Sequence, residues 1–173
     1  YGRTLSDRVR RHPEERDSAI RTLAQVRTQI HASKLNGLES LKSRVSRLIA
    51  RAPLAEDAKA ELIARTSRMP DGASPCHGDL MLSNVIECAD DGFAVVDWAR
   101  ACRGRAAADD AVTLLLLEME ESAEMANAYR SRLDSDPREI AQWTPLVAAS
   151  RTMMANERER AFLIPKIFSP RNI

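Results

Sequence analysis

Residues 76–98 read CHGDLMLSNVIECADDGFAVVDW, and this stretch decides the fold. Residues 85–88 alternate between apolar and polar side chains and residues 93–96 are apolar, so each segment predicts a short strand. Ala89-Asp90-Asp91-Gly92 lies between them and is a turn signal, because glycine accepts a positive φ at little cost. The stretch therefore predicts a short β-hairpin.

Three polar residues frame this hairpin. Asp79 follows His77-Gly78, Asn84 opens the hairpin and Asp97 closes it, so the hairpin brings Asn84 and Asp97 together. A hydroxyl is a weak nucleophile, and a carboxylate such as Asp79 can orient it and accept its proton. The oxygens of Asn84 and Asp97 are hard ligands that suit Mg²⁺. The spacing predicts phosphoryl transfer. The alternative, a surface loop before an ordinary hairpin with incidental acids, would suit a lone His-Gly-Asp better than the whole pattern.

The stretch resembles the Brenner-type motif of the aminoglycoside phosphotransferase and choline kinase superfamily. In that family H-G-D-x-x-x-x-N is followed by I-D-W and then by G-x-x-x-x-D-x-A, and residues 104–111 read GRAAADDA. The resemblance covers roughly residues 1–125 and is specific over 76–111. One departure is Met81-Leu82-Ser83, where many members carry His-Pro-Gly. We expect that change to bear on substrate choice more than on the reaction.

The resemblance implies an enzyme that transfers the γ-phosphoryl group of ATP, with Mg²⁺, to a hydroxyl of a small molecule. It implies that Asp79 is the catalytic base and that Asn84 and Asp97 are the metal ligands. It further implies that the buried Asp109, with His77, supports the catalytic loop. The acceptor stays open among aminoglycoside-, choline-, sugar- and amino-acid-alcohol-like molecules.

The glycines and lysines point to a missing part of such an enzyme. The six glycines form no G-x-G-x-x-G phosphate loop, and none of the four lysines follows a strand. Tyr1-Gly2-Arg3-Thr4-Leu5 resembles the stretch just after the interlobe hinge of the family. We therefore expect only the C-terminal lobe of a kinase-like protein, mainly α (α+β), with the N-lobe absent and the isolated chain inactive. Its expected parts are helical residues 1–71, a catalytic loop and metal-binding hairpin over 72–104, and helical residues 105–173.

The pattern before residue 76 predicts helices. One covers 14–31, and Asn36 with Glu39 reads as a capping box that starts the next. The apolar stripe of that second helix is Leu38, Leu41, Val45, Leu48 and Ile49. Its arginines are interpreted as a solvated face; they are Arg44, Arg47 and Arg51. Pro53 is expected in the first turn of a third helix.

The pattern after residue 104 predicts a buried helix. Residues 111–117 are apolar on every side, as in the middle of a bundle, and Asp109 or Asp110 is expected to cap that helix. Asp136 with Pro137 starts another helix, in which Pro145 predicts a kink or break. Residues 158–173, with Pro165 and Pro170, are expected to end irregularly.

Composition excludes several classes of protein. Aromatic residues make up 4% and the net charge is +1, which speaks against nucleic acid. No apolar run is long enough for a membrane span. The three cysteines form no even framework, so a reducing cytoplasm is expected. With His77 they could suggest zinc, but C-x-x-C is absent and Cys76 adjoins His77.

Two further interpretations stay open. The acidic run of Glu118, Glu120, Glu121 and Glu124 could line a pocket for a cationic acceptor, although a solvated helix end fits such runs more often. The alternative function is a non-catalytic helical or pseudokinase module. A surface exposed by the missing lobe would favour homo-oligomers.

Overall fold

A computed structural model describes residues 2–89 and 92–168 of the chain. Eight α-helices, three 3₁₀-helices and four strands lie in these ranges. The α-helices are α1 Leu5–Arg11, α2 Arg16–Ala32, α3 Leu41–Ala50, α4 Glu56–Arg68, α5 Ala106–Glu120, α6 Ala123–Arg130, α7 Pro137–Arg151 and α8 Glu157–Ile167. The strands are β1 Ser74–Cys76, β2 Val85–Glu87, β3 Phe93–Val95 and β4 Cys102–Gly104, and the 3₁₀-helices are η1 Pro13–Glu15, η2 Leu82–Asn84 and η3 Trp98–Arg100.

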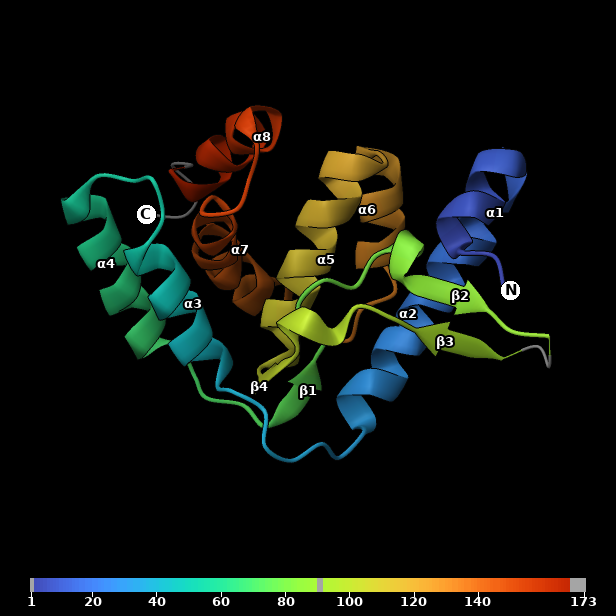
Figure 1. The fold of residues 1–173 in the computed structure, drawn as a ribbon, viewed down its shortest axis with the longest axis horizontal. Helices are drawn as coiled ribbons and strands as arrows, with labels where there is room; N and C mark the ends of the chain where they lie inside the picture. Colours follow the sequence, from blue (N-terminus) through green and yellow to red (C-terminus); the bar gives the residue numbers. More distant parts are fainter. Residues whose placement is uncertain (1, 90–91, 169–173) are drawn as a thin grey trace.

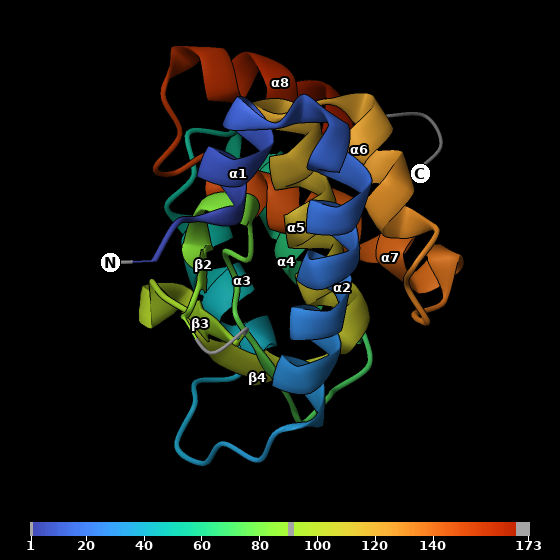
Figure 2. The ribbon, with the colours of Figure 1, turned by 90° about the vertical axis from the view of Figure 1, so that its right-hand side faces the viewer.

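Helix α5 runs through the centre of the fold (Figure 1). Every residue from Ala107 to Leu117 is buried, which confirms the expectation of a helix inside a bundle. Helices α7 and α6 pack on it, with α3, α4 and α8 beyond α7 and with α2 and α1 beyond α6. Figure 2 shows α2 and the hairpin β2–β3 on one face of the molecule. Each fully buried leucine contributes roughly 1.5–3 kcal/mol to this core.

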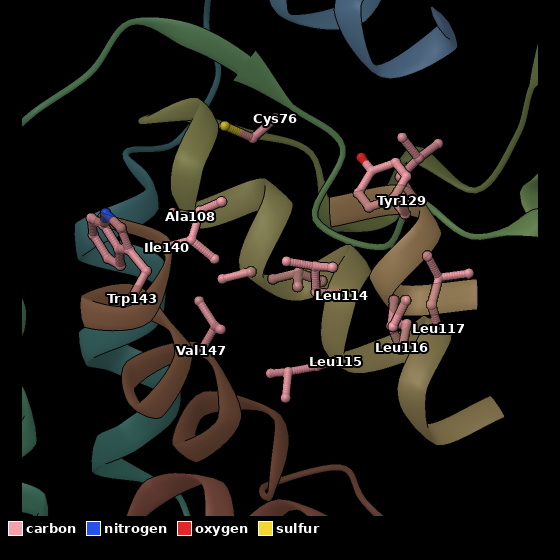
Figure 3. Close-up of a cluster of buried hydrophobic side chains, with 14 of the residues drawn as sticks. Cys76, Ala108, Leu114, Leu115, Leu116, Leu117, Tyr129, Ile140, Trp143 and Val147 are labelled. Carbon is pink, nitrogen blue, oxygen red and sulfur yellow. The ribbon is translucent and has the colours of Figure 1, made fainter. Parts of the chain in front are cut away.

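The core continues from α5 toward the catalytic loop (Figure 3). Tyr129 of α6 lies at the end of the cluster that Leu114, Leu116 and Leu117 form, and Trp143 of α7 lies at the other end, beside Ile140. Both aromatic rings are fully buried. Cys76 of β1 lies at the upper end of the same cluster. The segment that carries His77, Gly78 and Asp79 therefore leaves directly from the hydrophobic core.

Two separate antiparallel strand pairs hold the segment 74–104. The expected hairpin forms, with Val85 opposite Val95 and Glu87 opposite Phe93. Asp90 and Asp91 of the expected turn lie outside the described residues. Sequence reasoning missed the second pair, in which β1 and β4 align Cys76 with Cys102. It is non-local and only three residues long on each side, so no turn signal marks it.

Several expected helix boundaries were wrong. Helix α3 begins at Leu41 and not near Asn36, because the preceding residues extend along β4 and Arg103 N–H donates to the carbonyl of Glu39. Helix α4 begins at Glu56, three residues beyond Pro53. Acidic residues in its first turn suit the positive end of the helix dipole.

The C-terminal part also differs from the expectation. Helix α7 starts after the Asp136 cap, as expected, but runs through Pro145 without a break. Its packing against α5 and α3 outweighs the local cost of proline, about 3 kcal/mol. A capping box between Asn156 and Glu159 starts helix α8, which reaches Ile167 through Pro165. The irregular end expected for this segment falls largely on residues 169–173, outside the described residues. Among the described residues, no helix is both long enough and apolar enough to cross a membrane.

Candidate active site

Asp109 holds the backbone of the loop that carries Asp79. Its side chain is 2% exposed, and its Oδ2 and Oδ1 accept hydrogen bonds from the backbone N–H groups of His77 at 3.0 Å and Gly78 at 2.7 Å. Nε2 of His31 lies 2.9 Å from Oδ2 of the same carboxylate. Asp109 was expected to cap its own helix, which was wrong: α5 starts earlier, with Arg105 at the cap position and no side-chain cap. The carboxylate instead fixes the backbone of His77 and Gly78, directly before Asp79.

His77 ties this loop to the end of strand β3. The imidazole is fully buried, and its Nε2 lies 3.0 Å from the carbonyl oxygen of Val96. A carbonyl only accepts, so Nε2 carries the proton in this contact. The ring also lies against Trp98, with the two ring centroids 4.6 Å apart. His77 therefore connects the loop before Asp79 with the backbone on both sides of Asp97.

Gly78 is the position where the chain needs a glycine. Its φ is +76°, in the left-handed region, and an added Cβ would lie 2.4 Å from the carbonyl oxygen of Arg100. A side chain at this position would push the loop away from the η3 turn. The glycine thus allows Asp79 and the segment after Asp97 to approach each other.

Asp79 carries the candidate catalytic carboxylate. Its side chain is 15% exposed, and Arg151 Nη2 at the end of α7 donates to its Oδ1 at 2.8 Å. Arg100 Nε lies 3.7 Å from Oδ2. Two guanidinium groups therefore flank the carboxylate, which is reachable from the adjoining cavity.

Asn84 and Asp97 each offer a side-chain oxygen next to this loop that could bind a metal ion. The amide nitrogen of Asn84 donates to the backbone carbonyl of Asp79 at 2.9 Å, which directs the amide oxygen away from that carbonyl. Asp97 has a φ of 61°, and within residues 2–89 and 92–168 its carboxylate makes no hydrogen bond or ion pair. Aspartate tolerates this left-handed conformation better than most residues. One amide oxygen and one unpaired carboxylate fit the ligand preference of Mg²⁺.

A cavity of about 520 Å³ opens beside Asp79. Asp79, Asp97 and Asp109 line it, and Asn84 is not part of its lining. The other walls come from α3, from η3 and from the end of α7, including Met153 and Met154 just beyond that helix. Such a volume suits a small molecule.

The alternative zinc site is not formed in the part of the chain that the structure describes. His77 joins no group of three potential ligands, and Cys88 is exposed on the hairpin. His31, Cys76 and Asp109 do approach one another. A hydrogen bond with Cys102 and burial raise the pKa of the Cys76 thiol, which keeps it protonated and a poor metal ligand.

The acidic run at the end of α5 and the start of α6 does not line the cavity beside Asp79. Glu118 pairs with Lys166 of α8. The remaining acids, Glu120, Glu121 and Glu124, line a different hollow beside Arg10 and Arg16. They therefore do not border the cavity of the candidate catalytic residue.

The sequence matches the phosphotransferase enzyme family over residues 2–143. The chain belongs to this family. A comparison with curated protein sequences finds no match.

Solved structures give the fold of this phosphotransferase-family chain independently. Choline kinase LicA from Streptococcus pneumoniae matches with a TM-score of 0.61 at 17% identity, over 87% of this chain and 61% of that one. Aminoglycoside phosphotransferase APH(4)-Ia matches with a TM-score of 0.63 at 16% identity, over 95% of this chain and 69% of that one. Ethanolamine kinase from Plasmodium vivax matches with a TM-score of 0.59 at 14% identity, over 98% of this chain and 63% of that one.

These matches confirm the mainly helical, kinase-like fold class. The chain spans 61% of the length of the choline kinase. Identities this low establish the fold alone, so the reaction and its substrates are treated below as proposals.

Sequence reasoning missed three residues of the site. Arg151 and His31 contact Asp79 and Asp109 from helices that lie 72 and 78 residues away along the chain. No local pattern marks such distant partners. Arg100 could have been suspected, because it follows Asp97 by three residues and returns toward the loop.

Proposed function

We propose that this chain is the catalytic part of a kinase that transfers the γ-phosphoryl group of ATP to a hydroxyl of a small molecule. The observation that carries the proposal is the surroundings of Asp79. Its carboxylate shares one cavity with the unpaired carboxylate of Asp97, while the amide of Asn84 is held against the Asp79 backbone. Family membership supports the same reaction class.

Each side chain then has a defined task. Asp79 accepts the proton of the acceptor hydroxyl while the hydroxyl oxygen forms its bond to the γ-phosphorus. The bond from that phosphorus to the bridging oxygen breaks, and ADP leaves with the electron pair. Asn84 and Asp97 would hold Mg²⁺, which when bound neutralises charge on the phosphate oxygens. The proton on Asp79 returns to solvent after the product leaves.

Buried hydrogen bonds hold the backbone around Asp79 in place. This suits a catalytic base, because positioning of the groups dominates the catalysis of phosphoryl transfer. Asp109 fixes two consecutive backbone N–H groups directly before Asp79. His77 fixes the backbone directly before Asp97. The base and the charged metal ligand are therefore set relative to each other by buried hydrogen bonds.

We also infer that the grip on the nucleotide phosphates comes from outside these residues. The four lysines are Lys34, Lys42, Lys59 and Lys166, and none is on a strand. The 173-residue chain alone should therefore turn over ATP no faster than its Asp79→Ala variant.

The test is detection of the product with the full-length protein. ATP carrying labelled γ-phosphate is incubated with Mg²⁺ and a panel of hydroxyl acceptors, and the phosphate ester is followed by phosphorus NMR. We expect a labelled ester with the wild type and none with Asp79→Ala. Metal binding without any ester, unchanged by Asp79→Ala, would favour a non-catalytic module instead.

A further inference from the structure

Arginines dominate the wall of the Asp79 cavity. Among the residues that the structure describes, five arginines line it, and the acids in the lining are the three aspartates already assigned to the reaction or the loop. The arginines are Arg44, Arg47, Arg51, Arg100 and Arg151. The stripe on α3 was interpreted from the sequence as a solvated face. The fold instead turns it toward the candidate catalytic carboxylate.

Two of these arginines are already occupied by the protein. Arg44 donates to the backbone carbonyls of Ala99 and Ala101, each at 3.1 Å. Arg47 donates to both oxygens of Glu39 at 2.9 Å. These contacts connect α3 to the η3–β4 segment and explain why the stripe faces this way.

Arg51 and Arg151 are the groups with charge to offer a ligand. The side chain of Arg51 makes no hydrogen bond or ion pair with the described ranges of the chain, although it lines the cavity. Arg151 is only partly occupied by the protein: its Nη2 donates to Asp79 at 2.8 Å and its Nη1 donates to the carbonyl of Gly78 at 3.4 Å, while its Nε makes no hydrogen bond with the described residues. Burial lowers the pKa of Arg151, and the charge of Asp79 opposes this effect. A second anion beside Arg151 would compensate its burial further.

The arginines of α3 and α7 approach the Asp79 cavity from the side away from the hairpin. Helices α3 and α7 and the hairpin β2–β3 lie on opposite sides of strands β1 and β4 (Figure 1). Asn84 and Asp97 flank the hairpin. In-line transfer sets the leaving oxygen and the attacking hydroxyl on opposite sides of the phosphorus. With the metal on the hairpin side, the acceptor enters on the arginine side.

Charge then selects the acceptor. An ammonium group in this cavity would face several guanidinium groups, and like charges a few ångströms apart repel. A carboxylate or phosphate would form charge-assisted, two-pronged hydrogen bonds with arginine. Val45, Leu48, Met153 and Met154 of the same lining would cover an apolar part of the molecule.

We propose that the acceptor carries an anionic group, a carboxylate or a phosphate, and that Arg51 and Arg151 bind this group on the α3–α7 side of Asp79. This inference rests on the proposed function, because the bound molecule is an acceptor only if the protein transfers a phosphoryl group.

The test compares three probes of equal chain length on the full-length protein. They are ω-hydroxybutyrate, ω-hydroxybutyl phosphate and ω-aminobutanol, each with a terminal hydroxyl. We expect kcat/KM for at least one anionic probe to exceed that of aminobutanol by about tenfold or more. The better of the two anions identifies which group the site takes. A preference for aminobutanol would overturn the proposal.

Arg51→Gln tests whether Arg51 binds the anionic group, and Arg130→Gln is its control. Arg130 lies exposed on α6 outside the cavity lining, so both variants remove the same charge. Arg51→Gln should lower kcat/KM for the anionic probe about tenfold and leave the KM for ATP unchanged, while Arg130→Gln changes neither. A raised KM for ATP with an unchanged acceptor KM would assign Arg51 to the nucleotide and contradict us.

Binding without nucleotide separates this inference from the proposed reaction. If no probe is phosphorylated, calorimetry of the same probes still decides. Binding of an anionic probe that Arg51→Gln weakens supports the anion site even though transfer has failed. Equal or stronger binding of aminobutanol, or no anion binding at all, overturns it.

Discussion

The floor and the arginine wall of the Asp79 cavity are built differently. The floor is Asp109, which lines the cavity, and His77 and His31 support it from outside the lining. The three side chains are 8% exposed or less and are hydrogen-bonded to one another or to backbone. The wall on α3 and at the end of α7 is more exposed and holds side chains whose hydrogen-bonding capacity is not filled. Buried, satisfied groups hold one geometry, whereas exposed, unsatisfied ones are available to a ligand. We infer that the floor sets the reaction and the wall sets the acceptor.

The adjacent aspartates Asp109 and Asp110 bind different parts of the fold. Asp109 turns to the catalytic loop, whereas Asp110 turns to Arg27, whose Nε and Nη2 donate to its carboxylate at 2.8 and 2.6 Å. Burial raises the pKa of Asp110, and the hydrogen bonds from Arg27 and Ser135 oppose that shift. Asp110 therefore serves the junction of α2 and α5, away from the cavity.

The largest effect we predict outside Asp79 is on the metal side. Asp97→Ala removes a charged oxygen ligand, so the affinity for Mg·ATP and the rate should both fall, the rate by roughly hundredfold or more. Titration of Mg²⁺ at fixed ATP measures this. If Asp97→Ala kept its metal dependence, the metal would lie elsewhere and the division of the cavity would be wrong.

Asp109→Asn breaks the floor of the cavity, whereas Asp110→Asn breaks the neighbouring junction of α2 and α5. Each should lower the free energy of unfolding by about 3 kcal/mol, because each weakens buried, charge-assisted hydrogen bonds. Below both melting temperatures, Asp109→Asn should reduce phosphoryl transfer about tenfold, whereas Asp110→Asn should retain it. Denaturant unfolding and initial rates supply the two measurements. Equal losses of activity would mean that Asp109 has only a general stabilising role.

The smallest effect concerns pH and a pair far from the catalytic carboxylate. A hydrogen bond from Arg105 lowers the pKa of Glu139. A lowered folded-state pKa stabilises the fold above the unfolded-state pKa, about 4.3, and that stabilisation is lost as the pH falls through the folded-state pKa. Because Arg105 is 45% exposed, the pair should contribute no more than about 1 kcal/mol.

Melting temperatures between pH 7 and pH 3 check this pair. Glu139→Gln should be less stable than the wild type at neutral pH, and the difference should shrink as acid protonates Glu139. Glu157→Gln is the matched control, since Glu157 lies in the first turn of α8 and its side chain makes no hydrogen bond or ion pair with the described residues. A constant difference across the pH range would contradict the assignment.

The sequence was sufficient where the determinants are local. The hairpin, the buried α5 and the Asp136 start of α7 were all predicted, because periodicity, turn residues and caps act over a few positions. Helix α3 shows the limit. It does not begin at Asn36 as expected, because Glu39 and Ser40 instead pair in extended conformation with Arg103 of β4. That strand lies more than sixty residues away along the chain, so no local pattern predicts the pairing.

The candidate site divides along the same line. Its core, Asp79 with Asn84 and Asp97, comes from one stretch and could be predicted from it. The arginine wall could not be predicted, because the packing of α3 against α7 is what brings Arg51 and Arg151 to the same cavity as Asp79. An amphipathic stripe of arginines looks the same in sequence whether it faces solvent or a cavity.

The most direct test of the account is the Asp79→Ala variant of the full-length protein, measured for both turnover and nucleotide affinity. A base that acts on the acceptor contributes little to the binding of ATP in the ground state. Turnover should therefore fall by about 10²–10⁴-fold while the Kd for Mg·ATP stays within about twofold of the wild type. Near-normal turnover, or a loss of affinity that accounts for the whole loss of rate, would contradict the role of Asp79 at the centre of this site.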